Sequence, residues 1–211
     1  MARYVGPQCR YCRAEKRQLM LKGDRCKSGK CPIAQKKGAP GRGPRDRYKK
    51  MTDYGMQLRE RQKLKRLYGM LEKQFYRTFM EADRLPGKTG EELIMLLERR
   101  LDNVVYRMHF ASSRKQARQL IGHGHVQVNG KKVTIPSYIL KEGDEITIKA
   151  QSQKMVTIKE ALKEYSKAGV YPWIQLDPDV MKGTFLAVPR RSEVTELEDI
   201  NEQLIVELYS R

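Results

Sequence analysis

Four cysteines, which are all the cysteines of the chain, form two close pairs: Cys9-x2-Cys12 and Cys26-x4-Cys31. Two close thiol pairs separated by a loop are typical of a site in which four thiolates hold one tetrahedral zinc ion. With all four positions filled by protein ligands, no position is left for water or substrate, so we expect a structural zinc rather than a catalytic one. The metal would also stabilise a short segment that has few hydrophobic residues of its own.

Two disulfides and an iron–sulfur cluster are the alternatives for these cysteines. Spacing alone does not exclude a cluster. Disulfides are rare in reducing compartments. The sequence shows no secretory signal, and its longest all-apolar run, residues 93–97, is far shorter than the roughly 20 residues that span a bilayer. We therefore expect a cytoplasmic protein with reduced cysteines.

Positive charge is the other chemical signal of the chain. The formal net charge is +18, and residues 1–50 hold 16 Lys/Arg against 3 Asp/Glu, whereas residues 151–211 hold 8 against 10. Such an excess predicts a polyanionic partner, most plausibly nucleic acid, with binding that weakens as salt rises. A basic protein that is merely soluble is the bland alternative. A membrane-surface role is a weaker one, because the front of the chain has few large apolar residues to insert.

Residues 35–47 are rich in Gly, Pro and Arg and lack periodicity, which predicts an extended arm that is ordered by its partner. Arg42, Arg45 and Arg47 favour an arm that lies on phosphate over a plain linker.

Residues 52–83 are predicted to be helical. At about 100° per residue, one side would carry a basic stripe, with Glu72 as its nearest acidic neighbour, and the other an apolar face. The stripe consists of Arg59, Lys63, Arg66, Lys73 and Arg77, and the apolar face of Leu64, Leu67, Tyr68, Leu71, Phe75 and Phe79.

Residues 114–133 predict a short helix, a glycine turn and a hairpin. Ser112 or Ser113 can cap the helix, Gly122 or Gly124 can end it, and Asn129-Gly130 is a strong signal for a two-residue hairpin turn. One side of this element is apolar. The other is cationic or polar and carries Arg114, Lys115, Arg118, His123, His125, Asn129, Lys131 and Lys132.

Further elements surround this one. Thr89 and Glu92 form a capping-box signature for a helix whose apolar seam runs from Leu93 to Met108. Strands are predicted at residues 133–135, 144–148, 173–176 and 184–188, and a short strand followed by a helix at 155–165. Trp173 is expected to pack in the core. A last helix from about Val194, with an acidic solvent side, should fold back on the residues 64–79 region.

At residues 97–121 and 123–131 the chain closely resembles the bacterial small-subunit ribosomal protein four (S-four, uS-four) family. The same resemblance covers residues 54–69, 71–75 and 200–210, and the four cysteines match the family's metal-binding branch. It implies an α+β fold: a helical domain with an inserted small α/β RNA-binding module of the S-four type and an N-terminal four-cysteine zinc knot with a basic arm.

The resemblance implies a non-enzymatic constituent of the small ribosomal subunit. Such a protein binds 16S ribosomal RNA first at a multi-helix junction of the 5′ domain, nucleates assembly, neighbours ribosomal protein five and other small-subunit proteins, lies near the messenger RNA entry path and influences accuracy. Neither a membrane nor a small-molecule substrate is implied.

The predicted segments are 1–47 (zinc knot and arm), 48–98 with about 190–211 (helical domain), 99–163 (RNA-binding module) and 164–189 (strands and loops packed on the module). The predicted RNA contacts comprise the cations of the arm, the stripe and the helix–turn–hairpin, together with Lys49, Lys50, Tyr54, Arg61, Gln62 and Tyr68.

Two rival functions come from other classes. An RNA-modifying enzyme can carry the same small module, but this sequence has no room for a catalytic domain and no recognisable catalytic carboxylate motif. A zinc-dependent DNA-binding regulator would need the recognition-helix framework of common zinc fingers, which the cysteine spacing lacks.

Overall fold

The computed structural model describes residues 4–41, 43, 50–163, 169 and 171–210. The chain divides into two compact units, Met1–Leu93 with Val194–Arg211 (unit 1) and Ile94–Glu193 (unit 2). The boundary falls inside the helix α5 (Thr89–Glu98) rather than after residue 98. The finer division into four segments stays a prediction. No helix in the described ranges is long and apolar enough to cross a membrane.

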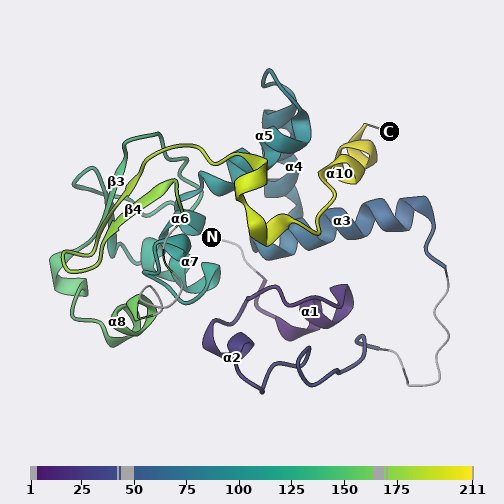
Figure 1. The fold of residues 1–211 in the computed structure, drawn as a ribbon, viewed down its shortest axis with the longest axis horizontal. Helices are drawn as coiled ribbons and strands as arrows, with labels where there is room; N and C mark the ends of the chain where they lie inside the picture. Colours follow the sequence, from purple (N-terminus) through teal and green to yellow (C-terminus); the bar gives the residue numbers. More distant parts are fainter. Residues whose placement is uncertain (1–3, 42, 44–49, 164–168, 170, 211) are drawn as a thin grey trace. The chain divides into compact units, whose positions relative to one another are not determined.

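Unit 1 is helical (Figure 1). The cysteine segment, residues 9–31, holds two short helices, α1 (Cys9–Glu15) and α2 (Asp24–Lys27). Then follow α3 (Asp53–Leu67) and α4 (Glu72–Asp83), and the chain returns at its end as α10 (Glu202–Tyr209). The Thr52 hydroxyl caps α3 by accepting a hydrogen bond from the amide of Gly55 at 3.2 Å.

The prediction of one helix over residues 52–83 is wrong. Gly69 adopts φ 61°, a left-handed conformation that ends α3, and its amide donates to the Arg66 carbonyl at 3.0 Å. Met70 N–H likewise turns back to the Lys65 carbonyl at 2.9 Å. The helical periodicity therefore restarts at Glu72, and side chains on the two sides of this break do not share one helix face.

The predicted return of the C-terminal helix is confirmed. Helix α10 packs on α3, the Gln57 amide donates to Glu207 at 3.0 Å, and the ring centroid of Tyr209 lies 4.4 Å from that of Phe79. The helix begins at Glu202 rather than at Val194, because Asn201 caps it by accepting from the amide of Gln203. Residues 194–200 instead run through a 3-10 turn, Thr195–Leu197.

The predicted helix after residue 89 is present, but the capping box is not. Helix α5 already includes Thr89, whose hydroxyl donates to the Asp83 carboxylate at 3.2 Å. The apolar seam is divided between α5 and α6 (Leu101–Arg107), and its members Leu93, Leu97, Leu101, Val104, Val105 and Met108 are all fully buried.

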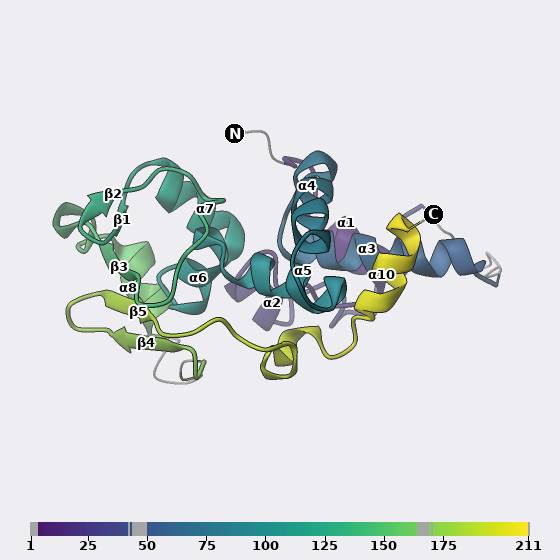
Figure 2. The same ribbon diagram turned by 90° about the horizontal axis from the view of Figure 1, so that it is seen from above.

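Unit 2 combines helices with one antiparallel sheet, which confirms the α+β class (Figure 2). The strands are β1 (Val126–Val128), β2 (Lys131–Lys132), β3 (Glu145–Ile148), β4 (Ile174–Asp177) and β5 (Lys182–Phe185), in the order β2-β1-β3-β5-β4. The late strands β4 and β5 thus extend the sheet that the hairpin begins. The other helices are α7 (Arg114–Gly122) and α8 (Val156–Leu162).

Two strand predictions in unit 2 are wrong. Residues 133–135 form no further strand, although the Val133 amide still donates to the Val126 carbonyl at 3.3 Å, and residue 155 leads directly into α8 with no strand before it. The predicted end of that helix, residues 164–165, lies outside the described residues. Trp173 is 3% exposed, and its ring centroid lies 4.8 Å from that of Tyr171, which confirms that it packs in the core.

The helix–turn–hairpin is confirmed in detail. Ser113 caps α7 by accepting from the amide of Gln116 at 3.3 Å, and Gly124 turns the chain with φ 76°. Asn129 and Gly130 have φ 50° and 74°, as a two-residue hairpin turn with both central residues left-handed requires.

Candidate nucleic-acid interface

The thiols of the cysteine segment are free and mostly buried. Cys12, Cys26 and Cys31 are buried, Cys9 is half-buried, and all four are free of disulfides. The backbone amide of Lys22 donates to the Cys26 sulfur at 3.3 Å. Burial raises the pKa of the Cys12 thiol, and the other three cysteines are near enough to raise it further.

Four free cysteines, the burial of three of them and an amide that donates to the Cys26 sulfur all suit a closed structural metal site. However, no group of three or more Cys, His, Asp or Glu in the described part of the chain is arranged to hold a metal ion. The zinc ion therefore stays a prediction.

The predicted arm contacts Arg42, Arg45, Arg47 and Lys49 lie outside the described residues. Lys50, which lies just before the N-terminus of α3, is exposed.

The predicted basic stripe is divided between two helices, with Arg59, Lys63 and Arg66 on α3 and Lys73 and Arg77 on α4. The prediction of one continuous stripe is therefore wrong. Lys73 and Arg77 are exposed, so both could reach phosphate.

The cations of α3 are also paired with acidic residues that the sequence analysis did not identify. Glu15 of α1 forms ion pairs with Arg59 at 3.4 Å and with Arg66, and Glu60 pairs with Lys63 at 2.5 Å. The interpretation of Glu72 as the nearest acidic residue is therefore wrong. Glu15 is distant in sequence, so the periodicity of residues 52–83 does not reveal it, whereas Glu60 lies on α3 itself and was visible in that stretch.

Other predicted contacts on α3 differ in exposure. Tyr54 is 56% exposed and Gln62 is half-buried. Arg61 pairs with Glu72 at 2.9 Å, and its guanidinium lies 5.5 Å from the Tyr209 ring centroid. Tyr68 is 1% exposed, so it belongs to the core, and its prediction as an RNA contact is wrong.

The helix–turn–hairpin exposes a basic edge made of Lys115, His123, Lys131 and Lys132. His125 is half-buried, with its Nδ1 2.9 Å from the Ser152 hydroxyl. Asn129 is exposed, but its amide nitrogen donates to Asp144 at 2.8 Å and its oxygen accepts from the amide of Glu145 at 2.9 Å. Those two bonds show that Asn129 holds the hairpin against β3.

Two arginines of α7 are structural. The Arg118 side chain is 12% exposed and its Nε donates to Asp102 at 2.6 Å. Arg114 is 6% exposed, its Nε donates to the Asn103 side-chain oxygen at 2.8 Å, and its guanidinium lies 4.6 Å from the Tyr106 ring centroid. Arg114 therefore also leaves the RNA-contact set.

Arg114 belongs to a buried polar network that sequence reasoning missed. Glu98 accepts hydrogen bonds from Arg107 at 2.5 and 2.7 Å and from the Asn103 side-chain amide at 2.9 Å. The Asn103 side-chain oxygen in turn accepts from Arg114. A signal was present, because these charged and amide residues interrupt the apolar seam of α5 and α6. The network fixes α7, and with it the exposed basic edge, to the core of unit 2.

Comparison with known proteins covers the whole chain. The family model described as "S4 domain" matches residues 99–146, and the one described as "Ribosomal protein S4/S9 N-terminal domain" matches residues 3–98. The chain is similar to the "Small ribosomal subunit protein uS4" of Thermoanaerobacter pseudethanolicus (54% identical over 211 residues) and of Trichlorobacter lovleyi (53%), with 100% of each chain covered in both cases.

Proposed function

Because this chain belongs to the family of the small ribosomal subunit protein uS4, we propose that it is a structural constituent of the small subunit in the cytoplasm. In this role it binds 16S ribosomal RNA at a multi-helix junction of the 5′ domain and nucleates assembly. The observation that carries the proposal is the full-length similarity to uS4 proteins, together with the exposed cations on both units.

The placement of the cations supports binding by shape and backbone. Helix α4 presents Lys73 and Arg77, and the helix–turn–hairpin presents Lys115, Lys131 and Lys132. A-form RNA hides its major groove from side chains, so cations on rigid elements would read phosphate positions rather than base edges. Release of counterions from those phosphates would supply much of the affinity.

Protein partners follow from the same family membership. We propose ribosomal protein five as a neighbour, a position near the messenger RNA entry path and an influence on accuracy. On the described surface of the C-terminal segment, Glu198 is exposed and suits a basic protein neighbour better than RNA, whereas the adjacent Asp199 pairs with Arg17.

We further propose one structural zinc ion, held by Cys9, Cys12, Cys26 and Cys31. The support is the spacing of the pairs, the burial of three thiols and the amide that points at the Cys26 sulfur. When bound, the ion would cross-link α1, α2 and the turn that carries Cys31.

A filter-binding titration against the 5′-domain RNA tests the RNA proposal. We expect tight, magnesium-dependent binding that weakens as salt rises. Lys132→Gln should weaken it and reduce the salt slope by about 1, whereas Lys88→Gln, which removes the same charge at a position outside the predicted contacts, should not weaken it. Equal affinity for random duplex DNA at matched salt would contradict specific RNA recognition.

A further inference from the structure

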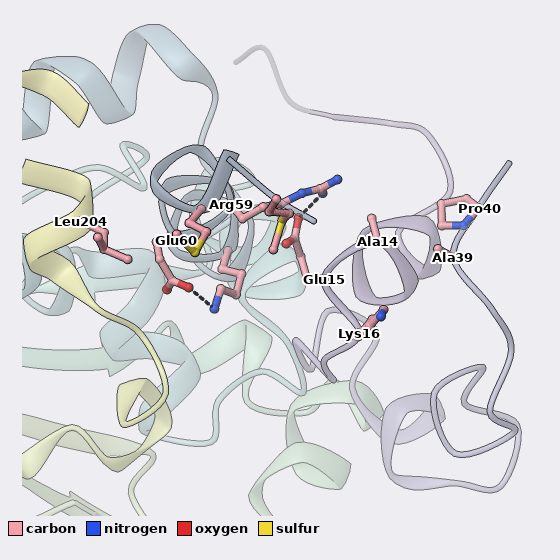
Figure 3. Close-up of a pocket in the computed structure, with 11 residues that line it drawn as sticks. Ala14, Glu15, Lys16, Ala39, Pro40, Arg59, Glu60 and Leu204 are labelled. Atoms are coloured by element: carbon pink, nitrogen blue, oxygen red, sulfur yellow. Dashed lines mark hydrogen bonds and ion pairs between the residues drawn. The ribbon is translucent and has the colours of Figure 1, made fainter. Parts of the chain in front are cut away.

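Helix α1 of the cysteine segment reaches α3 through one buried carboxylate (Figure 3). The Glu15 side chain is 2% exposed, and its Oε1 forms ion pairs with Arg59 at 3.4 Å and with Arg66. A carboxylate this deeply buried requires cationic partners, because an unpaired charge away from water is costly. Glu15 and the two arginines are thus one charged cluster, which we call the Glu15 cluster.

A second residue of α1 holds the same cluster. The Arg66 guanidinium lies 4.5 Å from the ring centroid of Tyr11, a cation–π distance. Past the end of α1, Arg17 pairs with Asp199 at 2.8 Å and donates to the Glu196 carbonyl at 2.5 Å. The cysteine segment is therefore fastened both to α3 and to the segment before α10, all within unit 1.

The cluster leaves one arginine available to a ligand. The Arg59 side chain is 46% exposed, whereas that of Arg66 is 19% exposed. Two guanidinium groups so close together repel each other unless an anion lies between them. Glu15 supplies this anion, and one positive charge of the cluster remains for an outside partner.

Arg59 also has room to leave this position. A cavity of about 580 Å³ opens beside the cluster and is lined by Glu15, Arg59, Glu60, Met56 and Leu204, among others. Because packing does not confine Arg59 on that side, the contact with Glu15 is what holds its direction.

We propose that Glu15 is a positioning residue for RNA binding, which holds Arg59 on α3 in the orientation that contacts phosphate. The proposal rests on the proposed function, and it takes Arg59, a member of the predicted basic stripe, as one of the RNA contacts. It links the cysteine segment to RNA recognition, because the side chain that orients Arg59 comes from α1.

Positioning and simple charge neutralisation predict opposite results for Glu15→Gln. If Glu15 merely cancelled charge, its removal would strengthen binding to every polyanion. If it positions Arg59, the affinity for 5′-domain RNA falls about tenfold, the loss of one charge-assisted contact, while the affinity for random duplex DNA stays the same or rises. Glu81→Gln, at an exposed site on α4, is the control with the same change in charge.

A double-mutant cycle gives the sharper result. Arg59→Gln alone should weaken RNA binding about tenfold, but it should cost less than about threefold when Glu15→Gln is already present. Equal losses in the two backgrounds, or an unchanged preference for 5′-domain RNA in Glu15→Gln, would overturn the proposal.

Arg59→Lys provides the test if Glu15→Gln does not fold. It changes a half-exposed side chain, keeps the charge and removes the planar fork. We expect the RNA affinity to fall at least about threefold, and an unchanged affinity would overturn the proposal. If the wild-type protein itself showed no preference for 5′-domain RNA, the proposed function would fail instead, so the two failures are distinguishable.

Discussion

Glu98 and Arg107 form an ion pair that is completely buried in unit 2. The Arg107 Nε lies 2.5 Å from Glu98 Oε2, its Nη2 lies 2.7 Å from Oε1, and both side chains are 0% exposed. The same guanidinium lies 4.4 Å from the Tyr171 ring centroid. Two paired hydrogen bonds and an aromatic face thus fix the end of α5 against α6.

Loss of one partner of this pair should be strongly destabilising. Glu98→Gln leaves the Arg107 charge buried without its carboxylate, and we expect the free energy of unfolding to fall by about 3–5 kcal/mol. Denaturant unfolding followed by the fluorescence of Trp173, which is the chain's one tryptophan and lies in unit 2, measures this loss. Glu145→Gln removes the partner of an exposed ion pair with Lys182, also within unit 2, and should cost less than about 1 kcal/mol. Similar losses for both variants would contradict the structural role of the buried pair.

Neighbouring cations on α7 should separate RNA binding from stability. Lys115 is exposed, so Lys115→Gln should weaken RNA binding and leave the melting temperature nearly unchanged. Arg114 is buried against Tyr106 and bonded to Asn103, so Arg114→Gln should lower the free energy of unfolding by about 2–4 kcal/mol. Filter binding and thermal unfolding of both variants check this contrast. A stable Arg114→Gln protein that binds RNA poorly would return Arg114 to the contact set.

Tyr209 should make the stability of unit 1 fall at alkaline pH. Burial raises the pKa of its hydroxyl to about 12, above the usual value of about 10. The folded form therefore keeps the proton while the unfolded form loses it, so this contribution is fully present below pH 10 and declines as the pH rises to about 12. Tyr209→Phe removes the titrating group and keeps the ring that packs on Phe79. Unfolding between pH 9 and pH 12 should show a smaller decline in the variant, and equal declines would contradict the role of Tyr209.

The cysteine segment should carry one zinc ion per chain. Mass spectrometry under non-denaturing conditions should find the ion in the wild type and not in Cys9→Ser or Cys26→Ser, because each of these variants removes one of four ligands. A chelator should lower the thermal stability of the wild type and leave that of Cys26→Ser unchanged. Two disulfides in freshly purified protein would overturn the zinc proposal.

Signals that act over a few residues are readable from the sequence, whereas a turn set by one backbone conformation is not. The helix–turn–hairpin was predictable because a serine cap and the Asn129-Gly130 turn act over a few residues. The length of α3 was not, because Gly69 acts through a left-handed conformation that helix periodicity ignores. Local signals therefore located these elements, and one backbone conformation decided where α3 ends.

The candidate site shows the limit of one-dimensional patterns more clearly. Arg59 and Arg114 both lie on predicted basic faces, yet one is half-exposed and the other buried. What separates them is the tertiary neighbourhood, which brings Glu15 to the first and Asn103 with Tyr106 to the second. Charge composition predicted the class of partner, but it could not tell which cations remain exposed to that partner.

Co-sedimentation of the tagged chain with ribosomal particles in its own cells tests the central claim most directly. The proposed function predicts that the chain migrates with the small subunit at one copy per 16S RNA and stays bound through washes at moderate salt. Recovery of the intact protein in the free-protein fraction, or equally on all nucleic acids, would contradict a structural role in the small subunit.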